Sequence, residues 1–280
     1  MRADDLRPVI YGSDTTVYVR KLTIDPLYIK VERDKRMPDD TVSYRPLLAR
    51  TLKKIIPFPL KVDSINLLRS EVRHNVLKEK TGNEGSIFFT GIKGHIINLK
   101  TFDYQEHDSL RMALECLFMG KGNMVFAFRQ DYIDTLQGFL LGARMGSLDM
   151  KELNRLITPM FLVRFDKGKL KSLEMRVKGN DKLAYGSMDM YYDGLTLSVL
   201  NEEGKKKNFY SFLVNLIVRT KNNKTGIVYA ERLREKSIFN FWARISINGL
   251  LTNLGVRKNS AQERRFYRSL KKHQLPQNIF

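Results

Sequence analysis

The residue types most often used in catalysis and metal binding are few in this chain, and their spacing suits neither task. The 280 residues contain one cysteine, Cys116, and four histidines, at His74, His95, His107 and His273. A zinc site needs several such ligands on converging elements, and none of these histidines stands at a ligand spacing from the cysteine. The cysteine lies on the apolar side of an alternating segment, which favours a core residue over a nucleophile.

Two glycine-containing stretches could imitate ligand-binding loops. Gly91-Ile-Lys-Gly94 matches the four-residue loop of KH nucleic-acid-binding domains, but that loop requires flanking helices, and the flanks here are predicted to be strands. A β-bulge or a close backbone approach explains these glycines better. Gly120-Lys-Gly122 lacks the GK[ST] sequence and following helix of a phosphate loop. No pair of carboxylates stands out as acid and base. We therefore predict a protein that is not an enzyme and has no cofactor and no metal.

The elements around these residues are predicted mainly from alternation of apolar and polar side chains. Residues 110–118 and 124–128 alternate with period two around a glycine-rich turn, which indicates a hairpin. The same alternation over 173–177, 183–192, 195–199, 210–218 and 226–232 predicts further strands joined by short turns. Asp193-Gly194 is typical of a two-residue hairpin turn.

The first half of the chain is predicted to follow the same plan less regularly. Strands are expected near 17–19, 27–31, 60–77 and 86–99, and helices over 45–56 and 149–156. The predicted fold is mainly β with flanking helices: an extended, curved antiparallel sheet, a meander, forming an apolar groove capped by C-terminal helices. Residues 1–236 would form this sheet domain. Residues 237–280 would form a basic C-terminal helical segment, with helices over 237–254 and 261–272.

The formal net charge of +19 is concentrated at the C-terminal end. Residues 204–280 contain 17 Lys and Arg against 3 Asp and Glu, whereas the first 203 residues are close to balance. A basic segment of this kind attracts phosphate groups of lipid or nucleic acid, and it also occurs simply as a soluble surface. The sequence begins without the apolar core of a signal peptide, and no stretch of eighteen or more apolar residues predicts a spanning helix.

One region of the sequence is similar to a known family. Residues 153–199 combine a Leu-Asn…Pro lead-in with a glycine and alternating strands, reading LNRLITPMFLVRFDKGKLKSLEMRVKGNDKLAYGSMDMYYDGLTLSVL. This pattern resembles the C-terminal region of the AsmA-like family of bacterial envelope proteins, and residues 57–99 and 237–255 look like its preceding and closing parts. The resemblance implies a long sheet curled into a groove with an apolar inner face, no catalytic residues, and a role in phospholipid transport or outer-membrane biogenesis.

The leading hypothesis is a membrane-associated protein of the periplasm or cell envelope that binds phospholipid or another anionic lipid in its groove, with envelope proteins as further partners. The expected groove-lining residues are Met112, Leu114, Phe126, Phe128, Phe212 and Val214. The expected membrane contacts are Trp242, Phe239, Arg264, Arg265, Lys271 and Lys272. The same apolar residues could instead pack against the helices as an ordinary core. Alternative functions are a nucleic-acid-binding module that uses the basic segment, and a structural scaffold whose strand edges pair with another chain.

Overall fold

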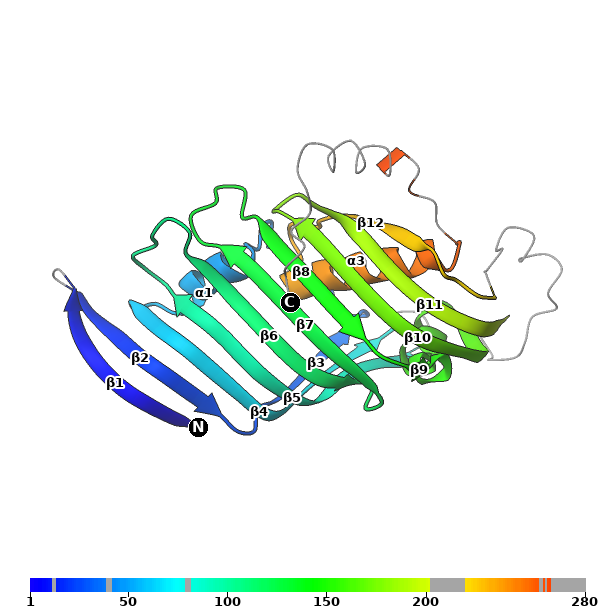
Figure 1. Ribbon diagram of the computed structural model, residues 1–280, viewed down its shortest axis with the longest axis horizontal. Helices are drawn as coiled ribbons and strands as arrows, with labels where there is room; N and C mark the ends of the chain where they lie inside the picture. Colours follow the sequence, from blue (N-terminus) through cyan, green and yellow to red (C-terminus); the bar gives the residue numbers. More distant parts are fainter. Residues whose placement is uncertain are drawn as a thin grey trace.

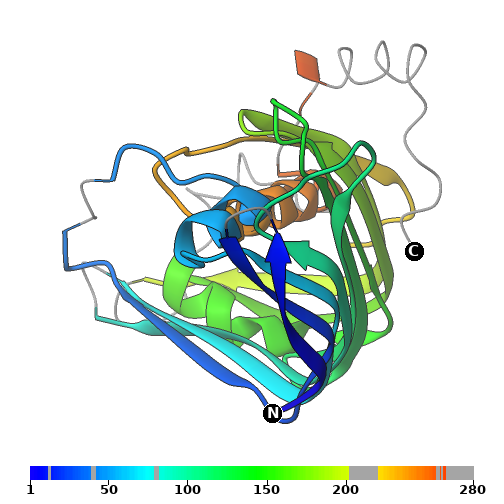
Figure 2. The ribbon, with the colours of Figure 1, turned by 90° about the vertical axis from the view of Figure 1, so that its left-hand side faces the viewer.

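A computed structural model shows one large sheet that curves around three helices (Figures 1 and 2). The structure describes residues 1–11, 14–38, 42–78, 82–201, 220–256, 259, 261 and 262, and gives only the backbone for residues 5–11, 14 and 15. The strand predicted for 210–218 and nearly all of the helix predicted for 261–272 lie outside these residues.

The sheet contains twelve strands. They are β1 Arg2–Tyr11, β2 Asp14–Ile24, β3 Tyr28–Asp34, β4 Leu60–Leu77, β5 Glu84–Lys100, β6 Ser109–Phe118, β7 Gly122–Asp131, β8 Phe139–Met145, β9 Leu148–Asp149, β10 Val163–Gly179, β11 Leu183–Val199 and β12 Thr225–Glu231. The helices are α1 Leu48–Ile55, a 3-10 turn η1 Met150–Leu153, α2 Asn154–Phe161 and α3 Ile238–Asn253. The prediction of a mainly β fold with flanking helices, including a C-terminal one, is confirmed.

From β4 to β12 the pairing is antiparallel, but the N-terminal part is not a meander. Strands β2 and β3 pair in parallel with the first and second halves of β4, so they act as one interrupted strand beside it. Parallel neighbours need a long crossover, usually helical, and residues 35–59 supply it with α1. The predicted helix over 45–56 was therefore the crossover of a parallel unit, a role that local periodicity does not reveal.

The hairpin predicted at Asp193-Gly194 is wrong, because β11 continues straight through this dipeptide. Lys169 pairs with Asp193 and Lys167 pairs with Thr196, so one strand carries an extra residue opposite the other. Gly194 has a φ of 64°, the left-handed conformation that a bulge of this type requires. A dipeptide suited to a tight turn is thus used here as a bulge inside a long strand.

Two local sequence features, a helix cap and a pair of glycines, have the structural effects that the sequence predicts. The Asp149 side chain accepts a hydrogen bond from the backbone N–H of Lys151 at 2.9 Å, so it caps the helical segment that runs through η1 and α2 to Phe161. At the glycine pair in β5 the register shifts between Thr90 and Lys93. A Cβ on Gly94 would lie 2.1 Å from the carbonyl oxygen of Ala113, so the close backbone approach there excludes a side chain.

The helices lie inside the curve of the sheet, on its concave side (Figure 2). The apolar interior between helices and sheet is divided into two clusters. The larger cluster lies beneath α3 and includes the fully buried Phe241 and Ile245 of that helix. The smaller lies beneath α1, where Ala49 packs against residues of β2, β4 and β5. Strand β6 runs between them: Met112 packs against the larger cluster and Leu114 against the smaller.

Helix α3 also closes one edge of the sheet. Among the described residues, strand β12 pairs only with β11, which leaves backbone groups on its other side. The Asn248 side chain of α3 accepts a hydrogen bond from Tyr229 N at 2.9 Å, and Asn259 Nδ2 donates to the Ile227 carbonyl at 3.0 Å. Side-chain amides thus occupy positions that a further strand would need, which prevents edge-to-edge pairing there.

A buried ion pair ties the starts of α1 and α3 to the sheet. Arg232, whose side chain is fully buried, donates to the Asp181 carboxylate and to the Arg45 carbonyl. Arg234 pairs with the other Asp181 oxygen at 2.6 Å, and Arg45 N donates to the Arg234 carbonyl at 2.8 Å. The segments that lead into the two helices are therefore joined through one carboxylate on the β10–β11 turn.

We predict that Asp181→Ala destabilises the protein by about 3–5 kcal/mol, because it leaves the buried Arg232 charge unpaired. Urea denaturation followed by circular dichroism measures this change. The control is Glu174→Ala, which removes the carboxylate that pairs with the solvent-accessible Arg144 and Arg176 on the outer face and should cost no more than about 1 kcal/mol. Equal losses for the two variants would contradict a specific role of the buried pair.

Candidate functional site: an apolar seam on the concave face

The concave floor of β6 and β7 is built by simple alternation. Over residues 112–118 and 123–126 the inward-facing residues are half-buried, whereas their outward-facing neighbours within these stretches are exposed. The floor residues, hereafter the seam, are Met112, Leu114, Cys116, Phe118, Met124 and Phe126. Cross-strand pairing places Leu114 beside Phe126 and Cys116 beside Met124, so these side chains form one contiguous apolar strip.

The strip is covered less completely than the strands on its α3 side. Leu141, Ala143, Met175 and Val177, which face inward from β8 and β10, are all less than 5% exposed. They are buried members of the larger cluster with α3, whereas the seam residues lie at the margins of the clusters: Met112, Phe118, Met124 and Phe126 pack against the larger one and Leu114 against the smaller, all of them only half-buried. The seam is consequently a part of the concave face where apolar surface stays partly open.

The predicted groove residues differ in how far the helices cover them. Met112, Leu114 and Phe126 lie in the seam. Phe128 is 2% exposed and packs against Trp242, with ring centroids 5.1 Å apart, so it belongs to the covered core. Phe212 and Val214 lie outside the described residues. The alternation that identified these positions could not distinguish Phe126 from Phe128, because the position of α3 decides which of them is covered.

The predicted membrane contacts also differ in their exposure to solvent. Phe239 is 65% exposed at the start of α3 and meets Trp242 edge-on at 5.4 Å. Trp242 is half-buried and contacts Phe126 at 5.2 Å, so it borders the seam rather than standing free. Arg264, Arg265, Lys271 and Lys272 lie outside the described residues. No helix within the described part of the chain is long and apolar enough to span a bilayer.

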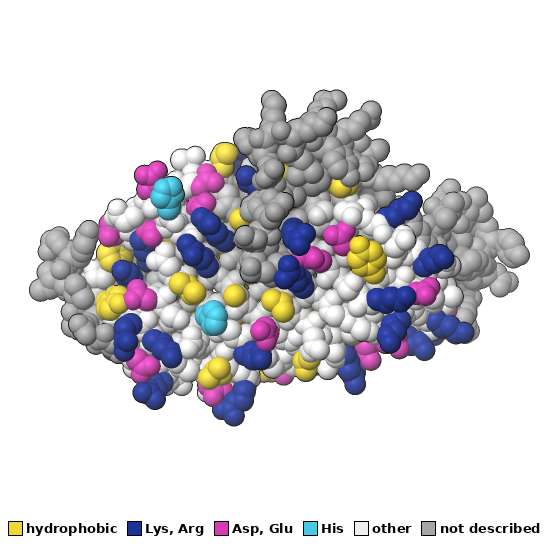
Figure 3. Space-filling view, viewed as in Figure 1, with side chains coloured by type: hydrophobic (Ala, Val, Ile, Leu, Met, Phe, Trp, Pro, Cys, Tyr) yellow, Lys and Arg dark blue, Asp and Glu magenta, His cyan; other side chains and the backbone are white. Residues whose placement is uncertain are grey.

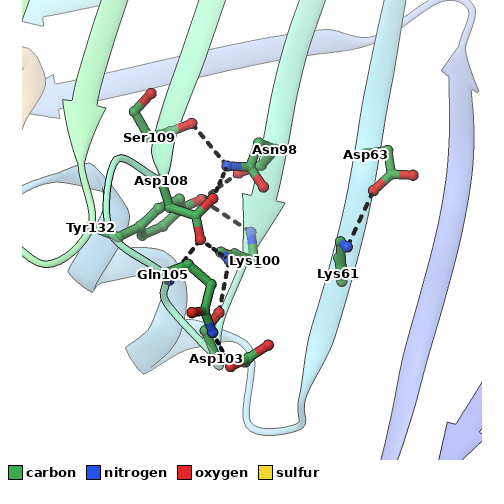
Figure 4. Close-up of polar contacts among 9 residues, drawn as sticks. All are labelled: Lys61, Asp63, Asn98, Lys100, Asp103, Gln105, Asp108, Ser109 and Tyr132. Carbon is green, nitrogen blue, oxygen red and sulfur yellow. Dashed lines mark hydrogen bonds and ion pairs between the residues drawn. The ribbon is translucent and has the colours of Figure 1, made fainter.

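Sequence reasoning missed a polar cluster at one end of β5 and β6 (Figure 4). Lys100, which is almost completely buried, donates to the Asp108 carboxylate and, at 2.8 Å, to the Asp103 carbonyl. Tyr132 accepts from Lys100 N at 3.0 Å and donates to the Asn98 carbonyl at 2.6 Å. A buried lysine beside an aspartate and a tyrosine is the kind of group that acid–base catalysis uses.

The hydrogen bonds of this cluster indicate a structural role. Burial opposes ionisation of Asp108, but hydrogen bonds from Lys100 and from Gln105 N outweigh it and keep the pKa of this carboxyl below its ordinary value. Burial raises the pKa of Tyr132, whose hydroxyl already has a donor and an acceptor partner. Because these groups bond to one another and to the backbone, the cluster holds the loop between β5 and β6 in place.

The outward face of the sheet has a different character (Figure 3). It carries mixed charges, and a hollow of about 600 Å³ lies among its side chains. Ion pairs line this hollow: Lys93 with Glu115 at 3.1 Å and Arg144 with Glu174 at 3.0 Å. The hollow is large enough for a small ligand. These four charges are mutually neutralised, and the carboxylate of Asp189, which also lines the hollow, accepts a hydrogen bond from Thr225 Oγ1.

No group of acidic, cysteine or histidine side chains that could hold a metal ion occurs among the described residues. Comparisons of the chain with protein-family models, curated proteins and solved structures find no match.

Cys116 provides a native probe of the seam. Burial raises the pKa of its thiol from the ordinary value of 9.0 to about 11, because the thiolate loses hydration. We predict that the folded protein reacts slowly with Ellman's reagent at pH 8 and that its rate keeps rising towards pH 11. In urea the rate should level off near pH 9. A folded-state profile that also levels off near pH 9 would show that the thiol is open to water.

The raised pKa of the Cys116 thiol also predicts that the folded protein loses stability as the pH rises. A salt-bridged carboxyl, whose pKa is lowered, has the opposite effect, because its contribution is lost as the pH falls. The folded state holds the thiol proton more tightly, so the contribution of the thiol is complete below pH 9 and is lost as pH rises towards 11. A Cys116→Ala variant should lose less stability than the parent protein between pH 9 and 11 in urea titrations.

Proposed function

We propose that this chain is a non-enzymatic cell-envelope protein of the AsmA-like type, whose concave sheet face holds the apolar chains of phospholipid. The observation that carries the proposal is the seam: a contiguous apolar strip that the helices of the described chain leave half-buried. A sheet with one apolar face must cover it by packing, by closure or by a ligand. Packing buries the apolar residues of β8 and β10 beneath α3 but covers β6 and β7 incompletely.

The composition of the seam supports acyl chains over a rigid, specific ligand. Met112 and Met124 have flexible, polarisable side chains that adapt to ligands of varied shape, and Phe118 and Phe126 add broad apolar surface. No charged side chain is among the six seam residues. An apolar chain of variable length and saturation fits such a surface without specific polar contacts.

The polar groups elsewhere support a binding role over catalysis. Two buried polar clusters, around Lys100 and around Arg232, bond internally through the Lys100 ammonium and the two terminal nitrogens of Arg232, and these bonds anchor loops and helices. Neither cluster is part of the seam. Periplasmic or envelope localisation and envelope protein partners belong to the same proposal and rest on the family resemblance of residues 153–199.

The test is to purify the protein from an expressing cell, extract it with organic solvent and quantify phospholipid by mass spectrometry. We expect phospholipid in the extract. Leu114→Asn should reduce its amount about tenfold, because an amide without a partner is unfavourable against an acyl chain. Thermal unfolding checks that the variant is folded.

Leu117→Asn is the matched control. It is the same substitution on the same strand, but Leu117 points outward and is 38% exposed. Lipid content should be unchanged in this variant. Extracts of the parent protein without phospholipid, together with no uptake of a fluorescent phospholipid, would refute the proposed function. Equal losses in both variants would show that lipid adheres without using the seam.

A further inference from the structure

Five connections lie at the same edge of the sheet, because the antiparallel register brings the corresponding strand ends together. We call this edge the upper rim, since it is uppermost in Figure 1. It comprises residues 55–59, 101–108, 132–138, 180–182 and 232–237, together with α1, which leads into the first of them.

Large apolar side chains project from several of these connections. Ile55 is 68% exposed and Leu136 is 58% exposed, so each has more than half of its surface open to solvent. The exposed large apolar residues of the upper rim are Ile55, Phe58, Ile133, Leu136 and Leu233. They sit on three separate connections with polar residues between them, so they form a row of tips and not one flat patch.

Ordered hydrogen bonds hold these tips outward. Thr101 Oγ1 donates to the Phe58 carbonyl at 3.1 Å and accepts from Leu60 N at 2.9 Å, which fixes the turn after α1. The Asp134 carboxylate accepts from Leu136 N at 2.9 Å, and Asp181 N donates to the Leu136 carbonyl at 3.0 Å. The apolar tips are therefore displayed by anchored loops and cannot fold back onto the sheet without breaking these bonds.

Three cations stand beside the tips. Arg50, Lys53 and Lys54 lie on the exposed side of α1, whose opposite side packs through Ala49 into the smaller cluster. None of the three has an ion pair within the described part of the chain, although Lys53 Nζ lies 5.6 Å from the centre of the Tyr104 ring. Exposed cations without acidic partners are available for an external anion.

We propose that the upper rim is a docking surface for an anionic lipid bilayer. Its apolar tips would enter the boundary between headgroups and acyl chains, and the α1 cations would contact lipid phosphates. Separate tips on three connections suit a fluid interface, whereas a protein partner usually covers a contiguous patch. This surface is distinct from the seam, and docking does not require that the seam hold a ligand.

The first experiment measures vesicle binding of the full chain by co-sedimentation. Vesicles of phosphatidylcholine with roughly one-third phosphatidylglycerol are compared with pure phosphatidylcholine at the same ionic strength. The triple variant R50Q/K53Q/K54Q should bind the anionic vesicles at least about tenfold more weakly, since each cation near a charged surface contributes about one kcal/mol, which is about a fivefold change.

The matched control removes three cations from the opposite rim. Lys121, Lys151 and Lys169 are exposed there, on the β6–β7 turn, on η1 and on β10. The variant K121Q/K151Q/K169Q has the same net charge as the test variant and keeps the same basic C-terminal segment. It should retain at least about half of the parent affinity. Equal weakening of both variants, or none in the α1 variant, would overturn the proposal.

The second experiment reports insertion. In a Cys116→Ala background, single cysteines at Leu136 and at Phe161 carry the same bimane label. Both parent residues are more than half exposed, but Phe161 lies on the opposite rim. Anionic vesicles should shift the emission of the label at 136 to shorter wavelength and leave the label at 161 unchanged. A shift at neither site, or an equal shift at both, would overturn the proposal. The lipid content of the seam, measured separately by mass spectrometry, is not affected by either result.

Discussion

The architecture depends on one constraint: a single curved sheet has one apolar face, and that face must be removed from water along its whole width. Three helices share the task, and each covers a different part. Helix α3 covers the strands from β7 to β12, α1 covers the N-terminal strands, and α2 lies between β5 and β10. The seam on β6 and β7 lies where the parts of the sheet covered by these helices adjoin.

The placement of the helices rests on polar anchors more than on helix propensity. Both α1 and α2 have eight residues, a length at which an isolated helix is unstable in water. The Asp181 carboxylate joins the segments that precede α1 and α3, and side-chain amides of Gln130 and Gln137 accept hydrogen bonds from Ala49 N and Leu47 N. These contacts hold α1 at the end of the sheet, with its cations outward.

The two edges of the sheet are treated differently. On β12, amides from Asn248 and Asn259 occupy backbone groups that would otherwise pair with another strand. Within the described residues, strand β1 pairs only with β2 and forms the other edge of the sheet. The edge that side chains occupy is therefore β12, beside α3, and β1 lies at the opposite end of the sheet. The curvature of the sheet, the covering helix α3 and the occupied backbone groups of β12 thus all stabilise the concave face at the α3 end of the sheet.

Much of the local structure could be read from the sequence, because it depends on near neighbours. Alternation located the hairpin of β6 and β7 and the long strands β4 and β5, and Asp149 marked the start of a helical segment. Only the tertiary structure decided the parallel pairing of β2 and β3 with β4, and the use of Asp193-Gly194 as a bulge. It also decided that Phe128 is covered while Phe126 remains half-buried, and that Ile55, Leu136 and Leu233 share one rim. The physical reason is that period-two alternation specifies which side of a strand is apolar. Which part of that side is covered, and which loops become neighbours, depends on long-range register and on where distant helices are anchored.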